Sequence, residues 1–218
     1  ILRTLGDVCP SGWPSFDAEK YLPQLHLKSA AVRAFFPECS EGKLEIFASP
    51  AAHHRMRCRF GVVWRVDSGR RILSYAKWGN YTASNEMHAP IPIDAFLVAS
   101  EAICATMPIV LAALEANPVL NEGLTGVHFL STKHGSEVIA ALIYATPLQQ
   151  EKWRSAAETA RGNWMPHVIN MIGLSKGVRV IVGSDWLLER YTLADGRILS
   201  YRHFYGTVGP CFTSSWMD

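Results

Sequence analysis

Residues 49–60 read Ser-Pro-Ala-Ala-His-His-Arg-Met-Arg-Cys-Arg-Phe, and arginine alternates with apolar or small residues from position 55 onward. Because successive side chains of a β-strand point to opposite faces, this spacing predicts a strand from about Arg55 to Val66. One face of the strand would carry the guanidinium groups of Arg55, Arg57 and Arg59. The other face would be apolar and consists of Met56, Cys58, Phe60, Val62 and Trp64. The segment therefore predicts a strand that is anchored in a core and presents a row of positive charge.

Two interpretations fit this charged face. A row of guanidinium groups suits contact with the phosphates of RNA or another polyanion. Alternatively, an edge strand carries charges that prevent aggregation. The formal net charge is only +2, but residues 55–77 contain seven Lys or Arg against the single acid Asp67, and residues 78–132 contain neither Lys nor Arg. Such segregation predicts one basic face for RNA and another face for packing or protein contact.

The remainder of the chain predicts hairpins interleaved with helices. Helices are expected over residues 20–35, with Asp17 as N-cap, and over residues 94–116 and 148–161. Turn residues between apolar runs predict four hairpins, at residues 55–66 with 72–78, 127–131 with 138–144, 167–174 with 178–182, and 189–193 with 198–204. The fold class is therefore predicted to be α+β, with a mostly antiparallel sheet built from hairpins and packed helices.

Composition narrows the class of protein. A hydrophobic content of 49% with 18% charged residues is typical of an ordered globular chain. The apolar stretch 96–114 is about as long as a membrane span, but Glu101 and Pro108 within it favour a buried helix, so no membrane contact is expected.

The five cysteines lack metal-ligand spacing, which predicts a reducing intracellular compartment and no metal site. Because the sequence begins at Ile1 without methionine, we also expect an upstream segment, for which a cleaved targeting peptide is one candidate.

The motif S-P-x-x-H-x-R-M-R-x-x-F resembles the N-terminal signature of the bacterial tRNA (uracil-5-)-methyltransferases. The resemblance continues with few gaps from about Tyr21 to about Glu189, through segments at residues 93–101, 117–120, 130–132, 142–144 and 185–189. It implies an N-terminal helix and extended segment over residues 1–50, an α+β RNA-handling domain over residues 51–205, and a divergent tail over residues 206–218.

The family's catalytic domain is not part of the resemblance. Family members bind S-adenosylmethionine at a glycine-rich turn and carry a nucleophilic cysteine in an S-C-N-P context. None of this chain's cysteines has those neighbours; they are Cys9, Cys39, Cys58, Cys104 and Cys211. No strand, G-x-G-x-x-G turn and helix follow one another either. Methyl transfer to uracil C5 needs both a thiolate and a bound methyl donor. We therefore expect no catalytic residue, no cofactor and no methylation by this chain alone.

Arg55 and Arg57 match the family's motif, and six further residues are candidates by position. The candidate RNA-contacting residues are His53, His54, Arg55, Arg57, Arg59, Lys77, Lys133 and His134. The two histidine rings beside the arginines could stack on an unpaired base, or else be buried or cap a turn. Lys133 and His134 lie at a predicted hairpin tip, where loops often meet ligands, but they could equally be solvated turn residues. Trp64 and Trp153 are expected in the core.

Several departures from the family pattern remove expected RNA contacts. Gly61 stands where family members have an arginine, Ala145 replaces a histidine, and Leu174 replaces an arginine. The tail segment at residues 211–216 lacks the Gln and Asn that help to hold the target uridine in the family. We therefore predict a non-catalytic RNA-binding protein, a structural or assembly component of a ribonucleoprotein, with rRNA or tRNA and other proteins as partners; a mitochondrial ribosome is one setting.

Two alternatives remain open. The chain could be the RNA-recognition part of an active methyltransferase whose catalytic domain lies beyond Asp218. It could also be a protein-interaction module that uses residues 78–132 without RNA contact.

Overall fold

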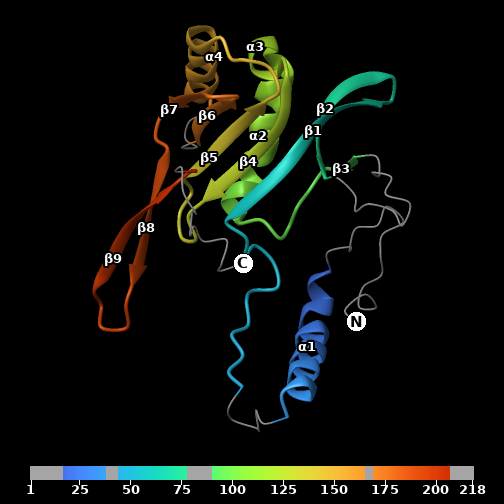
Figure 1. Ribbon diagram of the computed structural model, residues 1–218, viewed down its shortest axis with the longest axis vertical. Helices are drawn as coiled ribbons and strands as arrows, with labels where there is room; N and C mark the ends of the chain where they lie inside the picture. The colour runs from blue at the N-terminus through green and yellow to red at the C-terminus, as the bar shows by residue number, and fades with distance from the viewer. Residues whose placement is uncertain (1–16, 38–43, 78–89, 165–168, 207–218) are drawn as a thin grey trace.

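The computed structural model describes residues 17–37, 44–77, 90–164 and 169–206, and it contains two sheets (Figure 1). The larger sheet has seven strands in the order β3-β2-β1-β4-β5-β6-β7. Their bounds are β1 Arg57–Asp67, β2 Arg70–Lys77, β3 Ile91–Ile93, β4 Leu124–Ser131, β5 Val138–Tyr144, β6 Ile169–Ser175 and β7 Val178–Val182. Among these seven described strands, β5 and β6 pair in parallel and the other neighbours are antiparallel. The predicted α+β class is confirmed. The predicted divergent tail lies outside the described residues from residue 207 onward.

The described helices are the 3-10 turn η1 Ala18–Lys20 and the α-helices α1 Tyr21–Phe35, α2 Glu101–Ala116, α3 Pro118–Asn121 and α4 Gln150–Gly162. Of these, α2, α3 and α4 pack on one face of the large sheet. Buried side chains of α2 and α4, including Ile103, Val110 and Trp153, join those of Phe60 and Phe129 in the main core. Helix α4 forms the crossover that parallel pairing of β5 and β6 requires. Among the described residues, no helix is long and apolar enough to cross a membrane.

Helix α2 begins at Glu101, so the expected start at residue 94 was wrong. The Ser100 hydroxyl caps the helix by accepting a hydrogen bond from the Ile103 amide at 3.2 Å. The residues before it instead run beside the start of β1. The amides of His53 and Arg55 donate to the carbonyls of Leu97 and Val98, at 2.9 and 3.0 Å. These long-range bonds occupy carbonyls that an earlier helical turn would need.

The β1–β2 hairpin forms as expected, with Ser68 and Gly69 at positive φ in a two-residue turn. The apolar face of β1 is buried at Cys58 and Phe60, but Trp64 is 39% exposed. The prediction of a core position for Trp64 was therefore wrong. Strand β4 pairs with β1 only up to Gly61, so Trp64 lies where β2 alone flanks the strand. Trp153, by contrast, is buried as predicted.

The opposite face of the large sheet carries a smaller apolar cluster and a second sheet. Strands β8 Trp186–Thr192 and β9 Ile198–Phe204 form an antiparallel hairpin that projects away from the large sheet (Figure 1). At the base of this hairpin, Leu187 and Tyr205 pack against the sheet. The cluster consists of Leu130, Ile139, Ala141, Ile172, Leu187 and Tyr205.

Candidate nucleic-acid interface

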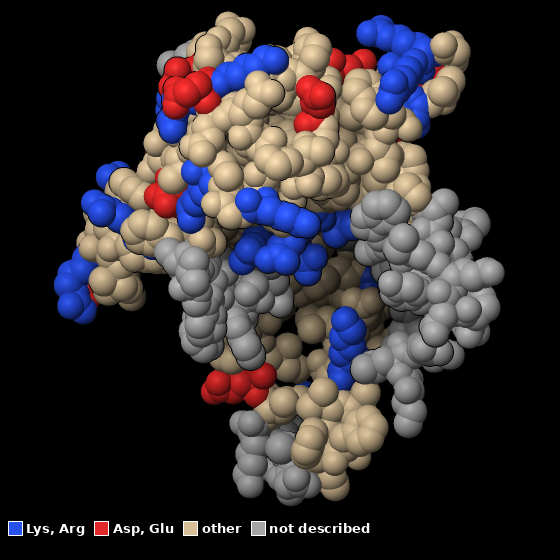
Figure 2. Space-filling model, turned by 45° about the horizontal axis from the view of Figure 1, so that its top comes forward, with Lys and Arg blue, Asp and Glu red and all other residues tan. Residues whose placement is uncertain are grey.

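Arg57 and Arg59 lie on the sheet face that is opposite to α2 and α4. In the antiparallel register of β1 and β4, Arg57 pairs with Leu130 and Arg59 pairs with His128, and paired residues share a face. The intervening side chains of Cys58 and Phe60 are 3% and 2% exposed, which fixes the strand. We call Arg57, Arg59 and His128 the arginine face. In Figure 2, basic side chains gather beside a recess near the centre of the view.

His128 completes this face, although no sequence pattern marks it as a site residue. Its Nδ1 lies 2.8 Å from the hydroxyl of buried Tyr205, and the guanidinium carbon of Arg57 lies 6.0 Å from the centre of the Tyr205 ring. Burial, then Arg59 and Arg57, lower the pKa of His128 to about 4. The imidazole is therefore neutral at neutral pH, and the hydroxyl of Tyr205 can donate to Nδ1.

His53 closes the turn ahead of β1. Its backbone has a φ of 56°, and its Nδ1 lies 2.9 Å from the carbonyl oxygen of Ala99. That contact fits the turn-capping alternative, since the ring is already engaged with the backbone. The neighbouring His54 has a buried Nδ1 without a hydrogen-bond partner among the described residues.

Lys77 lies at the end of β2 on the core side of the sheet. Its Nζ is 5.4 Å from the ring centres of both Phe60 and Phe96. Burial lowers the pKa of Lys77, the charge of Cys58 raises it, and the charge of Arg55 lowers it. The contacts with the two core rings place the ammonium on the other side of the sheet from Arg57 and Arg59.

Lys133 and His134 follow β4 and lie against the second sheet. The Lys133 amide donates to the carboxylate of buried Glu189 at 2.6 Å, which holds the loop to β8. The Lys133 Nζ lies 6.0 Å from the centre of the Tyr191 ring, and the His134 ring meets the same ring edge-on at 5.7 Å. The structure thus separates the predicted residues into the arginine face, Lys77 on the core side of the sheet, and this pair. The backbone of Arg55 forms a bridge with Ala99.

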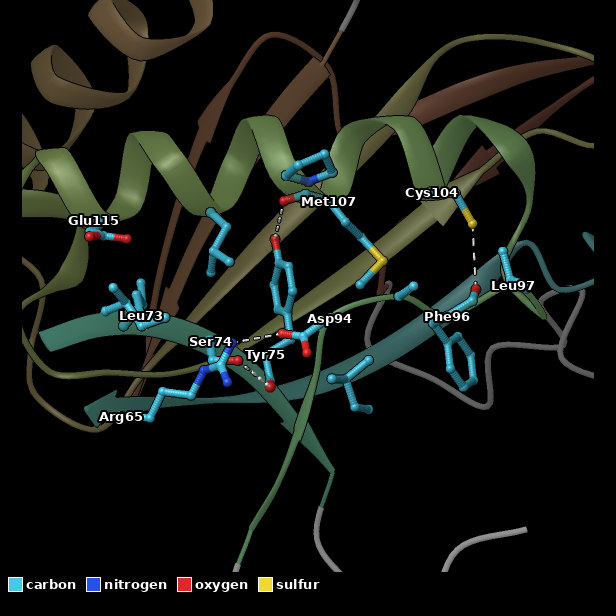
Figure 3. A pocket seen from close by; sticks show the side chains of 15 residues that line it. Arg65, Leu73, Ser74, Tyr75, Asp94, Phe96, Leu97, Cys104, Met107 and Glu115 are labelled. Carbon is cyan, nitrogen blue, oxygen red and sulfur yellow. Dashed lines mark hydrogen bonds and ion pairs between the residues drawn. The ribbon is translucent and has the colours of Figure 1, made fainter. Parts of the chain in front are cut away.

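A separate cavity of about 390 Å³ lies between α2 and strands β2 and β3 (Figure 3). Its lining is mainly apolar, with an ion pair of 2.8 Å between Arg65 and Asp94. Cys104 also lines it, and burial raises the pKa of its thiol, with the charge of Glu101 adding to the effect. A thiol with a raised pKa is a poor nucleophile. No cluster of three or more metal-binding side chains occurs within the part of the chain that the structure describes.

Comparisons with known proteins agree on one family. A family model described as tRNA (Uracil-5-)-methyltransferase matches residues 20–214. The tRNA/tmRNA (uracil-C(5))-methyltransferase of Pseudomonas savastanoi pv. phaseolicola is 35% identical over 187 residues, covering 86% of this chain and 48% of the relative. Its counterpart in Aromatoleum aromaticum is 34% identical over 194 residues, covering 89% of this chain and 49% of the relative. The chain thus spans about half the length of these curated relatives.

Among solved structures, a tRNA (uracil-54, C5)-methyltransferase from Pyrococcus abyssi, in complex with S-adenosyl-L-homocysteine, is similar. It is 14% identical with a TM-score of 0.46, and the match covers 87% of this chain and 44% of that chain.

Proposed function

Because this chain belongs to the tRNA (uracil-5-)-methyltransferase family, we propose that its arginine face binds RNA of the tRNA type. We further propose that these 218 residues hold the RNA without transferring a methyl group themselves. One observation carries the RNA proposal: Arg57 and Arg59 project from a strand whose intervening side chains are locked in the core. Their Cα atoms are spaced by two strand residues, or about 7 Å. A rigid pair of guanidinium groups suits adjacent phosphates because each can donate two parallel hydrogen bonds.

The absence of methyl transfer is supported by the chemistry of the cysteines. None stands in the family's S-C-N-P context, and the thiol of Cys104 has a raised pKa. The register also places Gly61 opposite Gly126 on the arginine face, where family members carry an arginine in place of Gly61. A Cβ atom at Gly126 would lie 2.9 Å from the carbonyl oxygen of Phe60, so the backbones are in close contact there. This end of the face therefore offers no charge to RNA.

Two biological roles are compatible with an RNA-binding region of this kind. The loss of charge at Gly61 favours a non-catalytic component of a ribonucleoprotein, for which a mitochondrial ribosome is one setting. The identity of 35% to tRNA/tmRNA methyltransferases favours the RNA-recognition part of an active enzyme. Both roles need the arginine face to bind RNA, and they differ in whether methylation follows.

Filter binding of a tRNA transcript across a salt series, from about 50 to about 300 mM, tests the RNA proposal. For the whole 218-residue protein the logarithm of the affinity should fall steeply with the logarithm of salt concentration. The double variant Arg57→Ala/Arg59→Ala should bind more weakly at low salt and reduce the magnitude of this slope by roughly 2, about 1 for each lost phosphate contact. The matched control is Arg70→Ala, whose side chain is exposed at the far end of the same hairpin; its slope should match that of the wild type. An unchanged slope for the double variant would refute RNA binding by this face.

A second arm of the same experiment adds S-adenosylmethionine with a labelled methyl group. The transcript should remain bound and unlabelled. Incorporation of label above that seen with protein omitted would show that these residues catalyse the transfer, and would overturn the non-catalytic part of the proposal.

A further inference from the structure

Three aromatic rings form a row on one face of the β8–β9 hairpin. The register pairs Leu187 with His203 and Glu189 with Tyr201, so these four side chains share a face with the alternate residue Tyr191. The rings of Tyr191 and Tyr201 are parallel to within 1° with centres 5.9 Å apart, and the centres of Tyr201 and His203 are 4.6 Å apart. We call Tyr191, Tyr201 and His203 the aromatic row.

The row has Lys133 and His134 at one end. At one end, the Lys133 Nζ and the His134 ring lie 6.0 and 5.7 Å from the centre of the Tyr191 ring. Beyond the other end, the base of the hairpin meets the arginine face: the Tyr205 ring lies 6.0 Å from the guanidinium carbon of Arg57. Tyr205 belongs to the same apolar cluster as Leu187, which is the strand partner of His203.

The row shares its face of the hairpin with two buried side chains. Leu187 and Glu189, on the same face of β8, are both buried, and the Glu189 carboxylate accepts a hydrogen bond from the Lys133 amide at 2.6 Å. Tyr201 nevertheless remains 36% exposed. Cross-strand aromatic pairs also stabilise hairpins, and that role alone would explain neighbouring rings. It would not explain why Lys133 and His134 lie against the exposed row at Tyr191.

We propose that the aromatic row is a stacking platform for unpaired RNA bases, with the sugar-phosphate backbone of the same strand crossing the arginine face. This inference rests on the proposed function and adds to it that the bound segment is single-stranded. Bases in a duplex are already stacked on one another, whereas splayed bases in loops can stack on Tyr and His rings. Aromatic rings flanked by basic groups are the combination that binds single strands with little sequence preference.

The test uses the whole 218-residue protein and fluorescence anisotropy with two probes, a single-stranded RNA of about 12 nucleotides and a blunt duplex of the same sequence. The wild type should prefer the single strand. Tyr201→Leu, which keeps apolar bulk but removes the π face, should weaken single-strand binding roughly five- to hundredfold. It should leave duplex binding unchanged. Tyr201→Phe keeps the ring and should bind like the wild type.

Phe204→Leu is the matched control. Phe204 is an exposed aromatic residue of the same strand, and its pairing with Trp186 places it on the opposite face of the hairpin. Its replacement should leave both affinities unchanged. Urea unfolding of each variant shows whether the hairpin is intact. If Tyr201→Leu does not fold, quenching of a 2-aminopurine base in RNA bound to the wild type and to Tyr201→Phe reports stacking directly, and absence of quenching overturns the inference.

The outcomes separate this inference from the proposed function. If Tyr201→Leu binds the single strand like the wild type while Arg57→Ala/Arg59→Ala weakens binding, the stacking platform is refuted and the arginine face stands. If both variants bind like the wild type, both proposals are refuted. Loss of single-strand binding by Tyr201→Leu, with Tyr201→Phe and Phe204→Leu unaffected, supports the platform.

Discussion

At the scale of the single residue, the arginine face contains a histidine that stays uncharged. The pKa of His128 is lowered from its ordinary value of 6.5 to about 4, first by burial and then by Arg59 and Arg57. As the pH falls through 6.5, the unfolded chain takes up a proton at this side chain, whereas the folded protein does so only near pH 4. The free energy of unfolding should therefore fall between these pH values, by up to about 3 kcal/mol for this group.

His128→Asn should remove this part of the pH dependence, because Asn does not titrate and its amide oxygen can still accept from the Tyr205 hydroxyl. Urea unfolding at pH 7 and pH 4.5 measures the effect. The comparison variant is His26→Asn on the exposed surface of α1, which should retain the full decrease. If the free energy of unfolding decreases equally for the wild type and His128→Asn, His128 is not the source of this pH dependence.

At the scale of the element, the β5–α4–β6 crossover depends on close contact between a strand and a helix. A Cβ atom on Gly173 would lie 2.8 Å from the ring of Trp153 and 2.9 Å from the Leu148 side chain. The indole cannot easily shift, because its Nε1 donates to the Tyr144 hydroxyl at 2.8 Å, and that hydroxyl donates to the Leu120 carbonyl at 2.7 Å.

Gly173→Ala should therefore lower the free energy of unfolding by about 1–3 kcal/mol through overpacking. Urea unfolding at constant pH measures the loss. Gly162→Ala, at the end of α4, is the control, since a Cβ atom there meets nothing within 4 Å. It should be neutral or slightly stabilising, because alanine favours helices and restricts the unfolded chain. If Gly173→Ala is as stable as the wild type, α4 must shift to make room for the added methyl group.

Local signals predicted most elements, and long-range pairing explains where prediction failed. Turn residues such as Ser68 and Gly69 act over a few positions, so the β1–β2 hairpin could be identified from the sequence alone. The start of α2 could not, because contacts with residues 53–55 decide it. The same holds for the site. Alternation placed Arg57 and Arg59 on one face, but His128 reaches that face only through β1–β4 pairing, and Tyr205 only from the base of the second hairpin.

At the scale of the whole molecule, helix α1 stands apart from the sheets (Figure 1). Both apolar clusters draw their buried members from residues 58–205. Within the described ranges, a side-chain hydrogen bond links α1 to a later segment. The Ser49 hydroxyl lies 3.2 Å from the hydroxyl of Tyr21, the first residue of α1. Large apolar side chains of α1 are exposed, among them Leu22, Leu27 and Phe35. The helix therefore contributes little to the burial that stabilises the domain, and the boundary near residue 50 remains a prediction.

Removal of residues 1–50 should consequently leave a folded protein. Urea unfolding of residues 51–218 should show one transition with a midpoint close to that of the full chain, since stability follows the apolar area buried and both clusters are retained. Leu187→Ala in the same fragment shows that the assay detects a lost core contact: this side chain is fully buried beneath the second hairpin, and its truncation should cost about 2–5 kcal/mol. A fragment that unfolds at markedly lower urea than the full chain would mean that the N-terminal segment is part of the domain, and that α1 covers apolar surface on which the sheets depend.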